Sequence, residues 1–233
     1  MVEKAESERS PLVDLIGEFW EPVDLKKKNP IHAPGQMYWA PIIYRDDDLL
    51  LLRLSQYDPT NERRSKYEMS RLSETPNPFD HAPVKELNLR NDEELVVFKC
   101  KHRSAMLFSV PMVEPTGEPP REKSFLLLPH YTFHADDPAS FKEAVRLFEY
   151  NALFHAPASN TLGLKDGYFR FDRMTVVPRN SLNDVMPQRL TPDALVFLQA
   201  WFDAYKSGVL RDELLADLIT EARTAREKRD ATK

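Results

Sequence analysis

The sequence predicts an α+β protein in which the strands come first and the helices come late. Short runs rich in β-forming residues recur between 35 and 177, separated by Pro, Asn and Asp turns. Apolar residues adopt helical spacing between 191 and 222, and no internal repeat indicates a solenoid. We therefore expect an N-terminal arm over 1–34, a β-rich domain over 35–190, and C-terminal helices with a charged tail over 191–233.

Composition indicates a globular protein and limits its partners. Hydrophobic residues make up 42% of the 233 residues, and the formal net charge is -5. That charge argues against unselective binding along a duplex backbone, although a local basic groove remains compatible with it. A single cysteine, Cys100, excludes an intrachain disulfide and fits a reducing compartment. Because no signal-peptide core and no membrane-length apolar run is found, we expect a cytoplasmic protein without a membrane segment.

The first two predicted strands flank an acidic turn. The run 35–45 has strand character, with Pro41 indicating an edge or a bulge, and a second strand follows at 49–54. Three aspartates at 46–48 separate the two strands. They lack the alternating spacing and the later glutamate of a calcium loop, so a turn is predicted.

A polar segment over 55–83 is predicted to be a long loop. Its cations, among them Arg63 and Arg71, are interleaved with Tyr57 and Tyr67. Cations beside aromatic side chains suit single-stranded RNA, which proteins bind by base stacking and phosphate contacts. A disordered loop with solvated charges is the equal alternative.

Further strands are predicted on both sides of a proline-rich loop at 111–123. Two or three strands occupy 84–109, and a buried strand occupies 124–129. Apolar spacing predicts a helix over 141–148, and the alternation at 168–177 predicts a half-exposed strand.

Capping residues define the first C-terminal helix. Thr191 suits the N-cap, Pro192 suits the first helical position, and Gly208 suits the C-terminal end. A second helix is predicted from Leu210 to Ala222 because its leucines lie on one side.

A basic cluster joins two of the predicted strands. Lys99, Lys101, His102 and Arg103 lie between two apolar runs. A fixed guanidinium beside lysine and histidine suits a phosphate ligand. The alternative is a charged hairpin whose cations only keep a sheet edge soluble.

Standard catalytic and metal-binding motifs are missing from the sequence. There is no G-x-S-x-G, no P-loop, no G-x-G-x-x-G and no cysteine pair. His130 and His134 lie four residues apart and precede Asp136, so a metal-dependent hydrolase is one alternative. Because the H-E-x-x-H pattern is absent, we expect no metal and no cofactor.

Four short runs resemble elements of the PemK/MazF-like toxin family in their order and spacing. The resemblance extends roughly from 83 to 208. The runs are E-L-V-V-F-K-C-K-H-R-S-A-M-L-F-S (94–109), L-L-L-P-H-Y-T (126–132), F-R-F-D-R-M (169–174) and L-T-P-D-A-L (190–195).

This resemblance implies an SH3-like β-barrel that cleaves single-stranded RNA without a metal. In that family the 2′-hydroxyl attacks phosphorus and leaves a cyclic phosphate. The matching positions assign catalysis to Arg103 and Thr132. RNA binding would then fall to five residues: Lys99, Lys101, His102, His130 and Arg170. A homodimer restrained by an antitoxin or other inhibitory protein partner is also implied.

For two of these residues, the chemistry of the side chain predicts a further role. His102 or His130 could shuttle a proton near neutral pH.

A non-catalytic adaptor is the alternative to the nuclease. Ser104 stands where the family has proline, and the net charge is acidic. In this interpretation the barrel and the helix bearing Trp201, Phe202 and Tyr205 form a protein interface.

Overall fold

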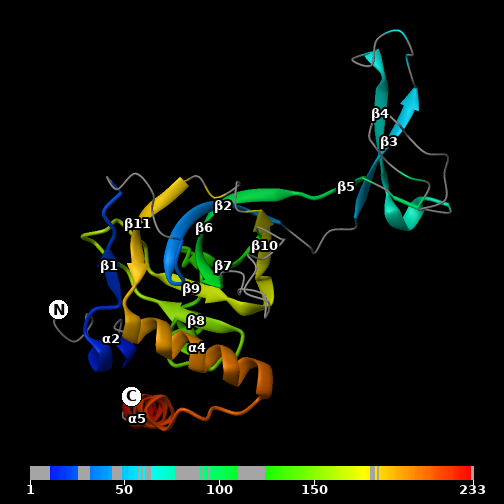
Figure 1. Ribbon diagram of the computed structural model, residues 1–233. Coiled ribbons are helices and arrows are strands. Elements are labelled where there is room, and N and C mark those ends of the chain that lie inside the picture. The colour runs from blue at the N-terminus through cyan, green and yellow to red at the C-terminus, as the bar shows by residue number, and fades with distance from the viewer. Residues whose placement is uncertain are drawn as a thin grey trace, which may run out of the picture. The chain divides into compact units, whose positions relative to one another are not determined.

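The computed structural model confirms the predicted α+β class (Figure 1). It describes residues 11–25, 32–43, 49–56, 58, 60, 64–76, 90, 92–93, 95–109, 124–178, 182 and 184–231. The predicted turn at 46–48, the predicted strand residues 84–89 and the proline-rich loop at 111–123 lie outside these residues.

The chain divides into two compact units. The first comprises Met1–Ala40 and His102–Lys233, and the second comprises Pro41–Lys101. The second unit is therefore inserted between two segments of the first.

An antiparallel sheet formed mainly by the first unit holds the candidate site. The order is β1 (Trp20–Pro22), β11 (Asp184–Leu190), β2 (Gln36–Ile43), β6 (Cys100–Ser109), β7 (Ser124–Thr132), β9 (Gly167–Arg170) and β8 (Leu153–Ala156). β10 (Thr175–Pro178) pairs with β7. Among the described strands β1 and β8 end this order, and no described pairing joins them.

One buried side chain holds β2 and β11 together where their register shifts. The Gln36 amide donates to the carbonyl oxygens of Met37, Met186 and Gln188 at 2.9, 2.8 and 3.0 Å. These bonds satisfy backbone acceptors that the irregular pairing would otherwise leave buried without a partner.

The second unit contains a three-stranded antiparallel sheet in the order β4-β3-β5. Its elements are β3 (Leu50–Gln56), β4 (Lys66–Arg71), the 3-10 helix η2 (Leu72–Glu74) and β5 (Leu95–Val97). β4 and η2 lie within the segment predicted as a long loop. Almost every side chain of β4 is exposed, so the apolar alternation that normally reveals a strand is missing from its sequence.

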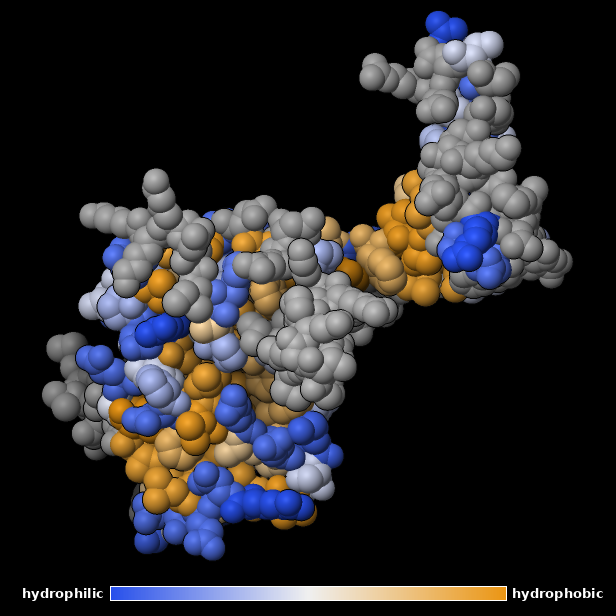
Figure 2. Space-filling model, in the orientation of Figure 1, coloured by the Kyte–Doolittle hydropathy of each residue, from blue (hydrophilic) through white to orange (hydrophobic). Residues whose placement is uncertain are grey.

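The helices of the first unit pack around its core. They are α2 (Pro11–Ile16), α3 (Ala139–Arg146), α4 (Pro192–Ser207) and α5 (Glu213–Ala231), and α2 packs against both α4 and α5. Figure 2 shows hydrophilic side chains over α5 at the lower edge of this unit. No described helix is both long enough and apolar enough to cross a membrane.

The predicted caps of α4 are confirmed. The Thr191 hydroxyl accepts from the Ala194 amide at 3.4 Å, and Gly208 ends the helix with φ 74. Glycine adopts this left-handed conformation without the steric cost that other residues incur.

The aromatic side chains of α4 pack inside the unit. The Trp201 indole donates to the Leu153 carbonyl at 2.9 Å. Phe202 packs 4.7 Å from Phe108, and Tyr205 packs 5.6 Å from Phe171, measured between ring centroids. These contacts account for much of the surface that the adaptor interpretation would use.

Candidate nucleic-acid interface

Three neighbouring strands align a cation with two aromatic rings. The β6–β7 register pairs Ala105 with Pro129, which places Arg103 opposite Tyr131. The β7–β9 register places Tyr131 opposite Tyr168. The Arg103 guanidinium carbon lies 4.6 Å from the centre of the Tyr131 ring, a distance typical of a cation–π contact.

A second guanidinium reaches the same ring from β9. Arg170 follows Tyr168 by two residues and so shares its face of the sheet. Its guanidinium carbon lies 5.4 Å from the Tyr131 ring centre. The Tyr131 and Tyr168 rings stack at 5.9 Å with an interplanar angle of 14°. We call these four half-buried residues, Arg103, Tyr131, Tyr168 and Arg170, the Arg–Tyr face.

The charges on this face are fixed by their neighbours. The Nε of Arg170 donates to Asp172 at 3.0 Å, and its Nη2 donates to the second carboxylate oxygen. These hydrogen bonds raise the pKa of Arg170, so the guanidinium stays charged. Burial raises the pKa of Tyr168, although Arg170 and Arg103 oppose that effect. The face therefore carries the guanidinium of Arg103 and the guanidinium of Arg170, and the second of these is paired with the Asp172 carboxylate.

His130 lies on the other side of the sheet from Tyr131. It is buried, and its Nδ1 shares a hydrogen bond of 3.1 Å with the Ser104 hydroxyl. Burial lowers the pKa of His130 to about 4. His130 is therefore neutral and enclosed at pH 7, and it lies away from the Arg–Tyr face.

Thr132 also projects from the face opposite to Arg103. Side chains alternate along a strand, so Thr132 shares the side of His130 and not that of Tyr131. The predicted catalytic pair, Arg103 and Thr132, is thus divided between the two faces of the sheet.

The remaining predicted RNA-binding residues lie elsewhere. Lys99 and Lys101 are exposed and belong to the second unit. His102 is exposed in the first unit and stacks on Trp39 at 5.6 Å, on the side of the sheet opposite to Arg103. Of the residues predicted from the sequence, Arg103 and Arg170 are the two that share the Arg–Tyr face.

The geometry does not assemble the proposed histidine metal site. His130 is buried, whereas His134 and Asp136 are exposed. Within the described ranges, no group of three or more His, Cys, Asp or Glu side chains could hold a metal ion.

A partly buried charged network adjoins the Arg–Tyr face and was not predicted from the sequence. His155 Nε2 lies 2.8 Å from Asp166 Oδ1, and Arg146 Nη2 lies 2.6 Å from Asp166 Oδ2. Phe133 connects this network to the face, because its ring lies 6.1 Å from the His155 ring and 5.4 Å from the Tyr168 ring.

Burial and pairing set the protonation of this network. Burial lowers the pKa of His155, although its hydrogen bond to Asp166 opposes the shift. Burial opposes ionisation of Asp166, but the contacts with His155 and Arg146 outweigh it and lower the pKa of this carboxyl. His155 is therefore neutral beside an ionised carboxylate, so its Nε2 carries the proton that it donates.

Neither a family model, nor a curated protein, nor a solved structure matches this chain. The function is therefore inferred from the chemistry of the described side chains.

Proposed function

We propose that this protein binds single-stranded RNA on the Arg–Tyr face and cleaves it without a metal. The observation that carries the proposal is the pair of guanidiniums, from Arg103 and Arg170, beside the single ring of Tyr131. Resemblance to the PemK/MazF-like toxins supports the same function from the sequence.

The guanidiniums of this face suit the phosphates of a single nucleic-acid strand, and its tyrosine rings suit the bases. Guanidiniums make charge-assisted hydrogen bonds to phosphate oxygens. Tyrosine rings provide surfaces on which unpaired bases stack. A duplex does not offer its base planes in this way, so the combination favours single-stranded RNA.

The proposed reaction needs charge neutralisation more than it needs a metal. The 2′-oxygen forms a bond to phosphorus while the bond to the 5′-oxygen breaks, which leaves a 2′,3′-cyclic phosphate and a 5′-hydroxyl. The proton of the 2′-hydroxyl passes through solvent to the departing oxygen. Arg103 would stabilise the charge that develops on the phosphate oxygens. Arg170 lies on the same face as Arg103. It would assist in this step, a role that the resemblance assigns to Thr132.

The proposed function includes four further properties of the protein. They are the SH3-like barrel, the homodimer, the inhibitory protein partner and the cytoplasmic location implied by the sequence. The described strand order from β1 to β8 is open, so the barrel is part of the proposal and not of the described fold.

The test is cleavage of a mixed-sequence single-stranded RNA in EDTA. Wild-type protein should release discrete cyclic-phosphate products, and Arg103→Ala should lose them while remaining folded. Arg211→Ala is the matched control, because it removes an exposed arginine just beyond the end of α4. Full activity of Arg103→Ala would refute the assignment. If the wild type binds the RNA but does not cleave it, the result would support an RNA-binding protein and contradict the nuclease.

A further inference from the structure

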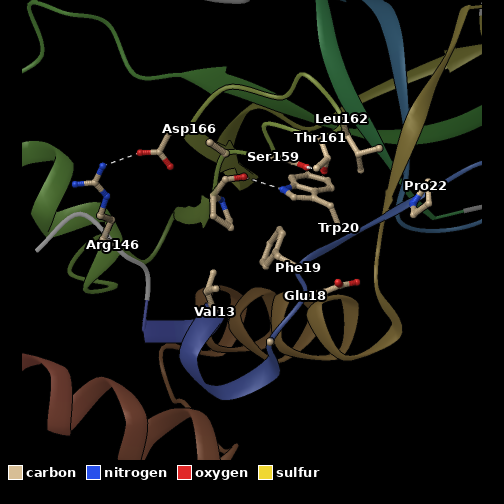
Figure 3. Close-up of a pocket in the computed structure, with 13 residues that line it drawn as sticks. Val13, Glu18, Phe19, Trp20, Pro22, Arg146, Ser159, Thr161, Leu162 and Asp166 are labelled. Atoms are coloured by element: carbon tan, nitrogen blue, oxygen red, sulfur yellow. Dashed lines mark hydrogen bonds and ion pairs between the residues drawn. The ribbon is translucent and has the colours of Figure 1, made fainter. Parts of the chain in front are cut away.

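A pocket of about 670 Å³ opens in the first unit, away from the residues predicted from the sequence (Figure 3). The N-terminal segment 13–22 forms one wall, and the segment 157–166 forms another. Phe19 and Trp20, both almost fully buried, form its aromatic floor, and Ser159 and Thr161 contribute hydroxyls. The volume lies within the range of about 300–1,000 Å³ that small-molecule sites occupy.

One end of this pocket presents a carboxylate and a guanidinium side by side. Asp166 and Arg146 both line it, and Figure 3 shows the ion pair between them. The side chain of Asp166 is 30% exposed. A carboxylate has about four lone-pair sites. His155 and Arg146 each engage one Asp166 oxygen, so acceptor capacity remains on both.

Arg146 also has unused hydrogen-bonding capacity. Its side chain is only 13% exposed. Among the described residues nothing accepts a hydrogen bond from its buried Nε. That Nε is enclosed by protein and is not reachable from the pocket. A guanidinium carries five N–H donors, and Arg146 uses Nη2 for Asp166, so donors at the tip of the guanidinium remain beside the Asp166 acceptors at this end of the pocket.

We propose that this pocket binds a guanine base. The Watson–Crick edge of guanine presents two adjacent donors, N1–H and the N2 amino group, beside one acceptor, O6. The Asp166 carboxylate would accept from the two donors, and Arg146 would donate to O6. The corresponding edges of adenine, cytosine and uracil do not place two donors together beside an acceptor, so the site discriminates against them.

The position of the pocket connects it to the Arg–Tyr face. Asp166 contacts His155, whose ring stacks on Phe133, and Phe133 packs on Tyr168 of that face. A strand held at Arg103 and Arg170 would thus extend toward the pocket, which would select guanine within single-stranded RNA. Only this last step, that the guanine belongs to RNA, depends on the proposed function.

Calorimetric titration of the full chain with free nucleosides tests the pocket. Guanosine should bind at least about tenfold more tightly than adenosine. Inosine is the matched control ligand because it keeps N1–H and O6 but lacks the N2 amino group. It should also bind less tightly, since Asp166 would lose one donor. Equal affinities for guanosine and adenosine, or no detectable guanosine binding, would overturn the proposal.

A blocking variant locates the binding. Ala158 is exposed and lines the pocket, so Ala158→Trp should fill it without disturbing the core and weaken guanosine binding at least tenfold. Ala225→Trp, at an exposed position of α5, is the control and should bind as the wild type does. Unchanged guanosine binding by Ala158→Trp would exclude this pocket.

Guanosine binding and RNA cleavage test the pocket and the proposed nuclease independently. Arg103→Ala should bind guanosine normally even when RNA cleavage is lost. Guanosine binding without any RNA cleavage would support the pocket and reject the nuclease. RNA cleavage without guanosine binding would support the nuclease and reject the pocket.

Discussion

The Ser104 hydroxyl and the Nδ1 of His130 share a buried hydrogen bond of 3.1 Å between β6 and β7. This bond fixes the imidazole on the inner side of the sheet, with its ring 5.6 Å from Phe169. A neutral histidine is accommodated there, whereas a charged one would lie in an apolar environment. The stability of the protein should therefore depend on pH.

Acidification is expected to destabilise the fold through His130. Burial lowers the pKa of His130 from 6.5 to about 4, so between these values the unfolded chain binds a proton that the folded chain does not. The free energy of unfolding should hence fall by about 3 kcal/mol as pH falls through this window, and remain intact above it. The lowered pKa of His155 acts in the same direction.

Urea unfolding at pH 7, 5 and 4 measures this dependence. His130→Gln should flatten the pH profile because it removes the titrating group. His134→Gln, at an exposed position, should keep the wild-type slope. An unchanged slope in His130→Gln would contradict the assignment.

Gly167 should tolerate no side chain. A Cβ at this position would lie 2.1 Å from the Tyr131 carbonyl oxygen and 2.8 Å from His130 Nε2. Backbone cannot yield as a flexible side chain does, so Gly167→Ala should cost about 3 kcal/mol of stability by separating β7 from β9. Gly163→Ala provides the comparison.

Nothing lies within 4 Å of a Cβ at Gly163, whose φ is +71. Its substitution should cost about 1–2 kcal/mol from backbone strain alone. Thermal unfolding of both variants gives the ranking, and a smaller loss for Gly167→Ala than for Gly163→Ala would disagree with the structure.

Tyr131 should contribute to RNA affinity through its ring. Tyr131→Ala should weaken binding of a fluorescent single-stranded RNA by about tenfold, whereas Tyr131→Phe should bind nearly as the wild type. Arg103→Ala should lower the slope of log K against log salt by about 0.7, the value for one phosphate contact on a single strand. Fluorescence anisotropy at several salt concentrations reports both effects. Equal binding by Tyr131→Ala and Tyr131→Phe would argue against a role for the ring that holds the two guanidiniums.

Thr191 should stabilise the start of α4 from two directions. Its hydroxyl accepts from the Ala194 amide and donates to the Glu18 carbonyl at 2.9 Å. Thr191→Ala should cost about 1–2 kcal/mol, while Thr191→Ser keeps both bonds and most of the stability. Chemical denaturation of the two variants separates the hydroxyl from the methyl group, and equal losses would exclude the cap.

Local chemistry made part of this fold predictable. Thr191, Pro192 and Gly208 identify α4 because caps depend on a few adjacent residues. β4 was not predicted because its side chains are exposed on both faces and its sequence lacks alternating apolar residues.

The candidate site was harder to predict than the helices. Arg103 was predicted from the basic cluster at 99–103 and from the family resemblance, and Arg170 from the resemblance alone. Motif spacing gave no information on which side of the sheet Thr132 would lie. That depends on register across β6 and β7. Arg146 lies in α3, His155 in β8 and Asp166 in the bend before β9, so no local sequence pattern predicts the contacts between them.

The place of β11 between β1 and β2 has a consequence for protein synthesis. β1 and β2 are translated well before β11, the strand that pairs with both. Until then their facing edges expose unpaired backbone groups, which are prone to join other chains. The pairing of β1 and β2 through β11 is therefore completed only well after both strands have been synthesised, and a chaperone that binds the nascent chain would shield their facing edges until then.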